Sequence, residues 1–275
     1  MIKNEVRVAF LAAALSAAVT SAAGATNPPE IGKWCADLHR DLLSVNLERC
    51  HARAWQNGGS SMQGRPIPFT YWGNSKGRRV LVLGSVHGDE ISSVSMLFRW
   101  MDFLDRTRKE SFLRENYYLL APLVNPDGYY VRPRTRVNAS GVDLNRNFRS
   151  KLWPQQALTH WKVKTKSDPR RYPGKEAGSE SETRLVEKWI EEFKPELIVT
   201  VHAPYGLIDH DGPIQFPKAG GPLPVKTLGS FPGSLGQYAG VEKKIPVVTV
   251  ELGAAKKMPD QKVIEDILVF IMRAD

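Results

Sequence analysis

The amino-acid sequence predicts a single α/β domain in which a mixed, twisted β-sheet is flanked by helices. Short, almost wholly apolar runs of strand length alternate along the chain with longer segments of helical periodicity, which is typical of this fold class. The apolar runs span residues 79–86, 116–124, 196–202 and 247–252, and the periodic segments span residues 90–106, 179–193 and 260–273. With 275 residues and 42% hydrophobic content, the chain can bury a core large enough for such a domain.

The first apolar run and the segment after it show both signals clearly. Residues 79–86, RVLVLGSV, carry hardly any polar side chain, as expected of a buried strand covered on both faces. Residues 90–106 place apolar side chains on one stripe at helical spacing, namely Ile91, Val94, Leu97, Met101 and Leu104. The two segments therefore predict a strand followed by an amphipathic helix.

The later segments continue the alternation. The second apolar run, residues 116–124, is followed by NPDG, a strong turn sequence. Residues 179–193 begin with Ser179 and Glu182 in capping-box register, which predicts a second helix. The two remaining apolar runs predict strands, and residues 260–273 predict a last helix.

The N-terminal stretch has the layout of a secretory signal peptide. A positive start is followed by a short apolar run, Val8–Val19, and by the small residues Ala23-Gly24-Ala25. We therefore expect residues 1–25 to be a signal peptide, with an uncleaved membrane anchor as the alternative. Residues 26–64 are expected to form an N-terminal extension and residues 65–275 the main domain. These features predict a periplasmic or secreted protein with no stable membrane insertion after cleavage.

Cysteine usage and charge bear on the compartment and the partners. An oxidising compartment favours a disulfide between Cys35 and Cys50, which have no CxxC pairing that would indicate a metal site. The formal net charge is +9, which suits an anionic partner: nucleic acid, an anionic cell envelope or a carboxylate-rich peptide. Export makes nucleic acid the poorest of these partners, and simple solvation explains the charge equally well.

Four polar side chains stand where predicted strands end. His87, Asn125, His202 and Glu251 each close one apolar run. In open α/β sheets, ligands bind outside the carboxyl ends of the strands. The four positions therefore predict one common site, although a lone histidine at a strand end is more often a simple hydrogen-bonding residue.

The sequence HGDE places His87 and Glu90 three residues apart at a turn from strand to helix. With His202 from a distant strand they would supply two imidazoles and one carboxylate. Three protein ligands leave a fourth position open on a zinc ion, as catalysis requires. Asp89 is an alternative carboxylate ligand within the same motif. The sequence thus favours one catalytic zinc per chain.

Glu251 lies in VTVELG, within a run that is otherwise expected to be interior. A buried carboxylate is costly without a partner or a task, so Glu251 is a candidate general base; a carboxylate that merely reaches solvent is the alternative. Residues 125–148 add a loop rich in arginine, the side chain best suited to bind a carboxylate or stabilise an oxyanion.

Taken in order, these motifs resemble the zinc carboxypeptidase family, also called the funnelins. The resemblance runs through HGDE, NPDG, RVNASGVDLNRNF, VHAPYG and VTVELG and covers roughly residues 65–273. It implies a zinc metallopeptidase with His87, Glu90 and His202 as zinc ligands and Glu251 as general base.

The resemblance also implies residues that bind the substrate. Asn145 and Arg146 are similar to the pair that binds the free carboxylate of the substrate, and Arg136 to the arginine that polarises the scissile carbonyl. Because RPRTR allows a shifted alignment, Arg134 is the alternative to Arg136. For the tyrosine that closes over the substrate in this family, Tyr238 and Tyr205 are the candidates, with Tyr238 as the first.

Within the family, the sequence looks most like bacterial murein peptide amidases and DL-carboxypeptidase-like members. This likeness implies peptidoglycan stem peptides as substrates, cut between γ-D-glutamate and diaminopimelate or trimmed at the end. Asp209 and Asp211 could then meet a basic substrate side chain. A general protein carboxypeptidase, an acyl-amino-acid deacylase and a non-catalytic wall-binding protein are the alternatives.

Overall fold

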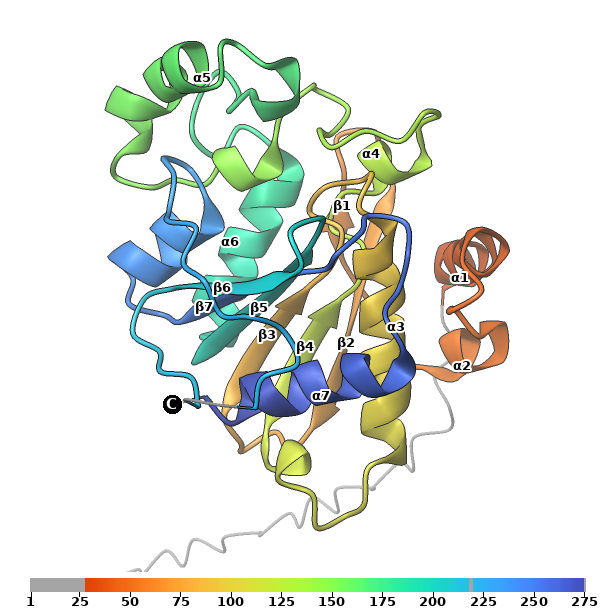
Figure 1. Ribbon diagram of the computed structural model, residues 1–275. Coiled ribbons are helices and arrows are strands. Elements are labelled where there is room, and N and C mark those ends of the chain that lie inside the picture. The colour runs from red at the N-terminus through yellow and green to blue at the C-terminus, as the bar shows by residue number, and fades with distance from the viewer. Residues whose placement is uncertain (1–27, 218–219, 275) are drawn as a thin grey trace, which may run out of the picture.

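The computed structural model describes residues 28–217 and 220–274, and within them a seven-stranded mixed sheet is flanked by helices, as the sequence predicts (Figure 1). The strand order is β1-β2-β4-β3-β5-β7-β6. The central strands β3, β4, β5 and β7 are parallel, whereas β6, β2 and β1 pair antiparallel with their neighbours at the two edges. The strands are β1 (Gln56–Ser60), β2 (Pro66–Gly73), β3 (Arg79–Leu83), β4 (Tyr117–Ala121), β5 (Leu197–His202), β6 (Leu207–Asp211) and β7 (Val247–Glu251).

Helices cover both faces of this sheet. Alternate side chains of β3 enter two separate apolar clusters, Val80 and Val82 with α3 and α7 and Leu81 and Leu83 with α6. Figure 1 shows α3 and α7 together on one face, with α1 beside α3. The helices are α1 (Pro29–Asp41), α2 (Leu47–Ala52), α3 (Ile91–Arg106), α4 (Pro126–Tyr130), α5 (Leu158–Lys164), α6 (Ser181–Phe193) and α7 (Gln261–Met272). None of those within the described residues is both long and apolar enough to span a membrane.

The N-terminal part of the described chain packs onto the same core. A disulfide joins Cys35 of α1 to Cys50 of α2, the pair that the sequence favours. The segment expected as an extension, residues 26–64, also supplies β1, which pairs with β2 across the expected boundary at residue 64. The division of the chain at that point stays a prediction. The expected signal peptide, residues 1–25, lies outside the described residues.

One local prediction differs from the structure. The capping box of Ser179 and Glu182 does not form, and the N-cap position of α6 is Glu180 without a side-chain cap. Ser179 Oγ instead donates to the Glu180 carboxylate. Glu182 is fully buried and accepts hydrogen bonds from the backbone amide of Met62 and from Asn138. Glu182 therefore makes tertiary hydrogen bonds in place of the local cap at the start of α6.

The fold brings the carboxyl ends of the parallel strands to one edge of the sheet. His202 and Glu251 are the last residues of β5 and β7 and are paired neighbours in that register. His87 follows the end of β3 by four residues and leads into α3. Three of the four predicted strand-end positions thus meet beside a common pocket.

Candidate active site

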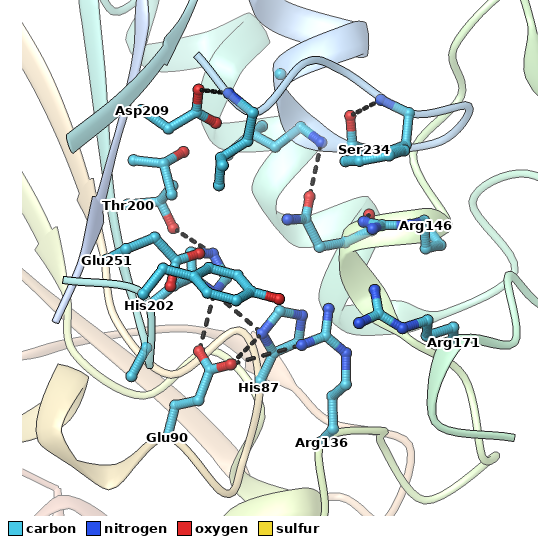
Figure 2. A pocket seen from close by; sticks show the side chains of 18 of the residues that line it. His87, Glu90, Arg136, Arg146, Arg171, Thr200, His202, Asp209, Ser234 and Glu251 are labelled. Carbon is cyan, nitrogen blue, oxygen red and sulfur yellow. Dashed lines mark hydrogen bonds and ion pairs between the residues drawn. The ribbon is translucent and has the colours of Figure 1, made fainter. Parts of the chain in front are cut away.

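His87, Glu90 and His202 form a compact buried group at this edge of the sheet (Figure 2). Nδ1 of His87 and Nδ1 of His202 lie 3.0 Å apart, and each lies 2.9 Å from an oxygen of the Glu90 carboxylate. All three side chains are at most 7% exposed. The alternative ligand Asp89 is bound instead to the guanidinium of Arg170, at 2.7 Å.

The outer nitrogens of both imidazoles are already engaged. His87 Nε2 donates to Asp143 Oδ1 at 3.1 Å, and His202 Nε2 lies 3.2 Å from Thr200 Oγ1. With its hydrogen on Nε2, His87 presents the lone pair of Nδ1 toward Nδ1 of His202 and the Glu90 carboxylate. A cation between these atoms would be attracted by the lone pair and by the carboxylate. Partners of this kind orient histidine ligands in metal sites, so the group fits a zinc ion with two nitrogen donors and one oxygen donor.

Glu251 lies beside this group and has an oxygen without a partner. Its Oε2 atom is buried and makes no hydrogen bond within the described chain. Burial raises the pKa of the Glu251 carboxyl, with His202 opposing the shift. A carboxyl whose pKa is raised is better suited to accept a proton and to return it.

Arg136 reaches the same group from the loop after α4. Its Nε donates to Asp143 Oδ2 at 2.9 Å, and its Nη1 lies 3.5 Å from Glu90 Oε1. Asp143 is fully buried, and although burial opposes the shift, Arg136 and His87 hold its pKa well below the ordinary value. Asp143 is therefore an anion that fixes both a histidine and an arginine.

Asn145 and Arg146 line the pocket from the next turn of the chain. Leu235 donates its backbone amide to Asn145 Oδ1, so the Asn145 amide nitrogen is left as a donor. Arg146 is 8% exposed, its Nε has no partner within the described residues, and burial lowers its pKa to about 10. A buried guanidinium in this state is stabilised by a bound anion.

The pocket has a volume of about 450 Å³, and its walls carry opposite charges. Figure 2 shows the guanidinium groups of Arg136, Arg146 and Arg171 on one side, facing the side that carries Glu251 and Asp209. The arrangement therefore offers a cationic wall and an anionic wall to a ligand. Such a pocket suits a small zwitterionic molecule or the charged end of a peptide.

Asp209 and Asp211 both line the pocket from the edge strand β6. Asp209 accepts a hydrogen bond from the backbone amide of Leu228, whereas Asp211 makes no hydrogen bond or ion pair among the described residues. Burial raises the pKa of Asp211 to about 6, and repulsion from Asp209 adds to the shift. A Cβ on Gly236 would lie 1.9 Å from Asp211 Oδ2, so a larger residue there would displace the Asp211 carboxylate.

Two residues expected at the site lie away from the pocket. Arg134 pairs with Asp41 of α1 at 2.7 Å and stacks over a tyrosine ring. Tyr238 is 8% exposed and stacks on Phe148. Tyr205, the other tyrosine considered, is 58% exposed and does line the pocket. The geometry therefore favours Arg136 over Arg134 and Tyr205 over Tyr238.

Sequence reasoning missed three residues that the structure brings to the site: Asp143, Thr200 and Arg171. Asp143 stands in the motif GVDLNRN, where a charged residue between two apolar ones was the available signal. Thr200 precedes His202 by two residues on one strand and so shares its face. Nothing in the sequence singles out Arg171.

The mixed sheet and the buried histidine–glutamate group at the carboxyl ends of its parallel strands define the protein as a zinc metallohydrolase by class. The chain belongs to the zinc carboxypeptidase family, whose family model matches residues 47–208. It is a zinc metallopeptidase that uses one zinc ion. Glu251 lies outside the matched range.

Individual relatives agree with this family. The chain is 32% identical to murein peptide amidase A of Escherichia coli (strain K12) over 207 residues, which are 71% of this chain and 82% of that protein. It is 32% identical to the carboxypeptidase N catalytic chain of Rattus norvegicus over 134 residues, covering 41% of this chain and 29% of that one.

Solved structures share the fold. The murein-tripeptide amidase MpaA from Escherichia coli O157 superimposes with a TM-score of 0.55 at 24% identity, over 79% of this chain and 91% of that chain. Bovine thrombin-activatable fibrinolysis inhibitor, solved with a tick carboxypeptidase inhibitor, gives a TM-score of 0.61 at 18% identity, over 88% and 92% of the two chains.

Proposed function

We propose that this zinc peptidase hydrolyses an amide bond next to a residue with a free carboxylate, in peptidoglycan stem peptides outside the cytoplasm. One observation carries the proposal: a single pocket holds a buried arginine, Arg146, and a carboxylate, Asp211, neither of which has an ion pair among the described residues. Diaminopimelate offers a carboxylate and an amino group at each end. Such a residue complements both walls of the pocket.

The carboxylate next to the cleaved bond is assigned to Asn145 and Arg146. The donor left free on Asn145 and the unpaired Nε of Arg146 are both hydrogen-bond donors within one pocket wall. Charge-assisted hydrogen bonds to a carboxylate are about twice as strong as neutral ones. These two side chains therefore anchor and orient the substrate. The amino group at the far end of the released residue is assigned to Asp211, with Asp209 beside it.

His87, Glu90 and His202 are assigned as the residues that hold the zinc ion. A zinc ion held by these residues would supply Lewis acidity for the scissile carbonyl and the attacking water. Asp143 keeps the hydrogen of His87 on Nε2, so that Nδ1 remains a donor atom to the metal. The protein contributes a dry and pre-oriented set of three donors.

Glu251 is assigned as the group that moves the proton. Its unpaired Oε2 takes the proton from the attacking water and then gives it to the leaving amine nitrogen. Arg136, held in place by Asp143, donates to the oxygen of the scissile carbonyl as negative charge develops on it. Both residues line the pocket that receives the anchored substrate.

Similarity and the N-terminal sequence support the substrate and the compartment. Murein peptide amidase A of Escherichia coli, 82% of whose length is matched, is named for action on murein peptides. The Cys35–Cys50 disulfide suits an oxidising compartment, and the signal-like residues 1–25 would direct export. We therefore assign the protein to the periplasm or the exterior.

Mass spectrometry of murein tripeptide and tetrapeptide, incubated with the mature protein with and without a zinc chelator, tests the proposal. Chelator-sensitive release of diaminopimelate from tripeptide would establish an amidase-type cut. Loss of only the terminal D-alanine from tetrapeptide would make the enzyme a trimming carboxypeptidase. If zinc-loaded protein cleaves ordinary peptides or acyl amino acids but no murein peptide, the substrate assignment is wrong. If it cleaves nothing, the wall-binding alternative gains support.

A further inference from the structure

The guanidinium of Arg171 lies at the mouth of the pocket, and its positive charge is only weakly neutralised. It lines the pocket and its side chain is 38% exposed. Among the described residues its guanidinium has one ion pair, a 3.6 Å contact with Asp168, and no hydrogen bond. The contact is longer than a hydrogen bond, so most donors of Arg171 remain available to a ligand.

The other arginines of the pocket differ from Arg171 in their partners or in depth. Arg136 is bound to the buried Asp143, and Arg170 to Asp89. Arg146 also has no ion pair within the described ranges, but it is 8% exposed and lies deeper. Among the described residues, the pocket thus has two guanidinium groups that no carboxylate binds by a hydrogen bond, one inside and one at the mouth.

The backbone around Arg171 is fixed on both sides. The short turn Pro169–Arg171 is capped by Asp168, whose Oδ1 accepts from the Arg170 amide. The Arg170 side chain binds Asp89 next to the histidine–glutamate group, and the Tyr172 carbonyl accepts the backbone amide of Asp143. Arg171 is therefore held at the pocket by its two neighbours, which lowers the entropy cost of binding a ligand there.

The two guanidinium groups also affect each other. Burial is the main cause of the lowered pKa of Arg146; Asp143 opposes it, and the positive charges of Arg136 and Arg171 add to it. A ligand with one carboxylate at Arg146 relieves one of the two charges. A ligand with two carboxylates relieves both, which favours it by charge complementarity.

We propose that Arg171 forms a second anion subsite, so that the preferred substrates carry a second carboxylate that lies at the pocket mouth while the first lies at Arg146. This inference deepens the proposed function and rests on it. Two sources could supply the second carboxylate: the residue on the acyl side of the cleaved bond, or the side chain of the released residue. The shared chemistry is a dicarboxylate peptide.

Kinetics with three matched peptides and four proteins test the proposal. The peptides are L-Ala-γ-D-Glu-diaminopimelate, its analogue with the D-glutamate α-carboxylate as an amide, and its analogue with lysine in place of diaminopimelate. The proteins are wild type, Arg171→Gln, Arg171→Lys and Lys162→Gln. Lys162 is an exposed cation of α5 outside the pocket, so Lys162→Gln removes the same charge without the subsite.

We expect Arg171→Gln to raise KM for the parent peptide about tenfold, the scale of one charged hydrogen bond, with kcat changed less than about twofold. Arg171→Lys should recover part of the loss. One of the two analogues lacks the carboxylate that Arg171 binds. For that analogue, Arg171→Gln should leave KM unchanged, and the analogue therefore identifies which residue supplies the second carboxylate. An equal rise in KM for all three peptides, no rise at all, or an equal effect of Lys162→Gln would overturn the proposal.

Failure of the proposed function is distinguishable from failure of this inference. If the wild type cleaves none of the three peptides, the substrate assignment fails first. Calorimetry on the zinc-loaded proteins then tests Arg171 alone, with glutarate, adipate and pimelate compared with hexanoate. A dicarboxylate that binds wild type more tightly than hexanoate, and loses that advantage in Arg171→Gln, supports the subsite. Equal binding of all four acids by wild type rejects it.

Discussion

His87 and Asp143 are joined by a buried hydrogen bond from Nε2 to Oδ1, with 3.1 Å between the two atoms. The second oxygen of Asp143 accepts from Nε of Arg136 at 2.9 Å. One carboxylate therefore orients a candidate zinc ligand and the candidate oxyanion arginine together. It does so from a fully buried position, where water does not compete for either hydrogen bond.

Replacing Asp143 by asparagine should weaken zinc binding. The amide cannot serve both His87 and Arg136 as an anion, so the ring of His87 loses its orientation. Loss of such partners costs about 10- to 100-fold in metal affinity. Competition with a fluorescent chelator measures the change. Asp102→Asn, at a surface ion pair on α3, is the matched control and should leave zinc affinity unaltered.

Glu251→Gln should keep the zinc ion and lose nearly all turnover. Glutamine has a similar size but cannot take a proton from the attacking water, and a general base contributes about 10²- to 10⁴-fold. Zinc content by atomic absorption and kcat on the same preparation measure both effects. Retained turnover in this variant would show that another group is the base.

Arg136→Gln and Arg134→Gln separate two arginines that are neighbours in sequence. Arg136→Gln should lower kcat about 10²- to 10³-fold, the cost of one oxyanion donor. Arg134→Gln should leave kcat near the wild-type value, because this side chain binds Asp41 of α1. Steady-state kinetics on one substrate compare the two. A larger loss of kcat in Arg134→Gln than in Arg136→Gln would assign the oxyanion role to Arg134.

Asp211→Asn should stabilise the protein at alkaline pH but not in acid. Because the folded pKa is raised to about 6, the folded protein holds this proton more tightly than the unfolded chain, and stability falls as pH rises through 6. Asparagine imitates the protonated form. Since Asp211 is part-exposed, we expect a gain in Tm of only about 2 °C at pH 8 and none at pH 4.

The same variant tests recognition at the anionic wall. Asp211→Asn should reduce the preference for substrates with an amino group on the released residue over neutral ones, and Asp209→Asn should do so less, because Asp209 is engaged with the Leu228 amide. An unchanged preference in both variants would remove the two aspartates from the substrate assignment.

Breaking the disulfide should destabilise the N-terminal helices. Cys35 and Cys50 are 15 residues apart, and closing a loop of that length contributes about 3 kcal/mol. Cys35→Ser with Cys50→Ser should therefore lower the midpoint of urea unfolding while leaving kcat near wild type, since both cysteines lie outside the pocket. A midpoint equal to that of wild type would assign the disulfide no role in stability.

Local pattern in the sequence was enough to find most of the central sheet. The apolar runs at 79–86 and 247–252 contain β3 and β7, because a strand buried on both faces is apolar at every position. The edge strand β6 was not predicted, since its sequence LIDHD mixes polar and apolar residues as an edge strand allows. The predicted capping box of Ser179 and Glu182 does not form, because Glu182 accepts hydrogen bonds from residues distant in sequence instead.

The sequence by itself determined the chemical types at the strand ends: two histidines, and a glutamate on a separate strand that meets them. These follow from motif order and from the rule that parallel strands end at one edge. Only the tertiary structure decided which charges are neutralised. Arg134 is paired with Asp41, 93 residues away, while Arg171, within the described part of the chain, has a 3.6 Å ion pair with Asp168 and no hydrogen bond. Ion pairs depend on partners that folding brings together, and spacing along the chain does not carry that information.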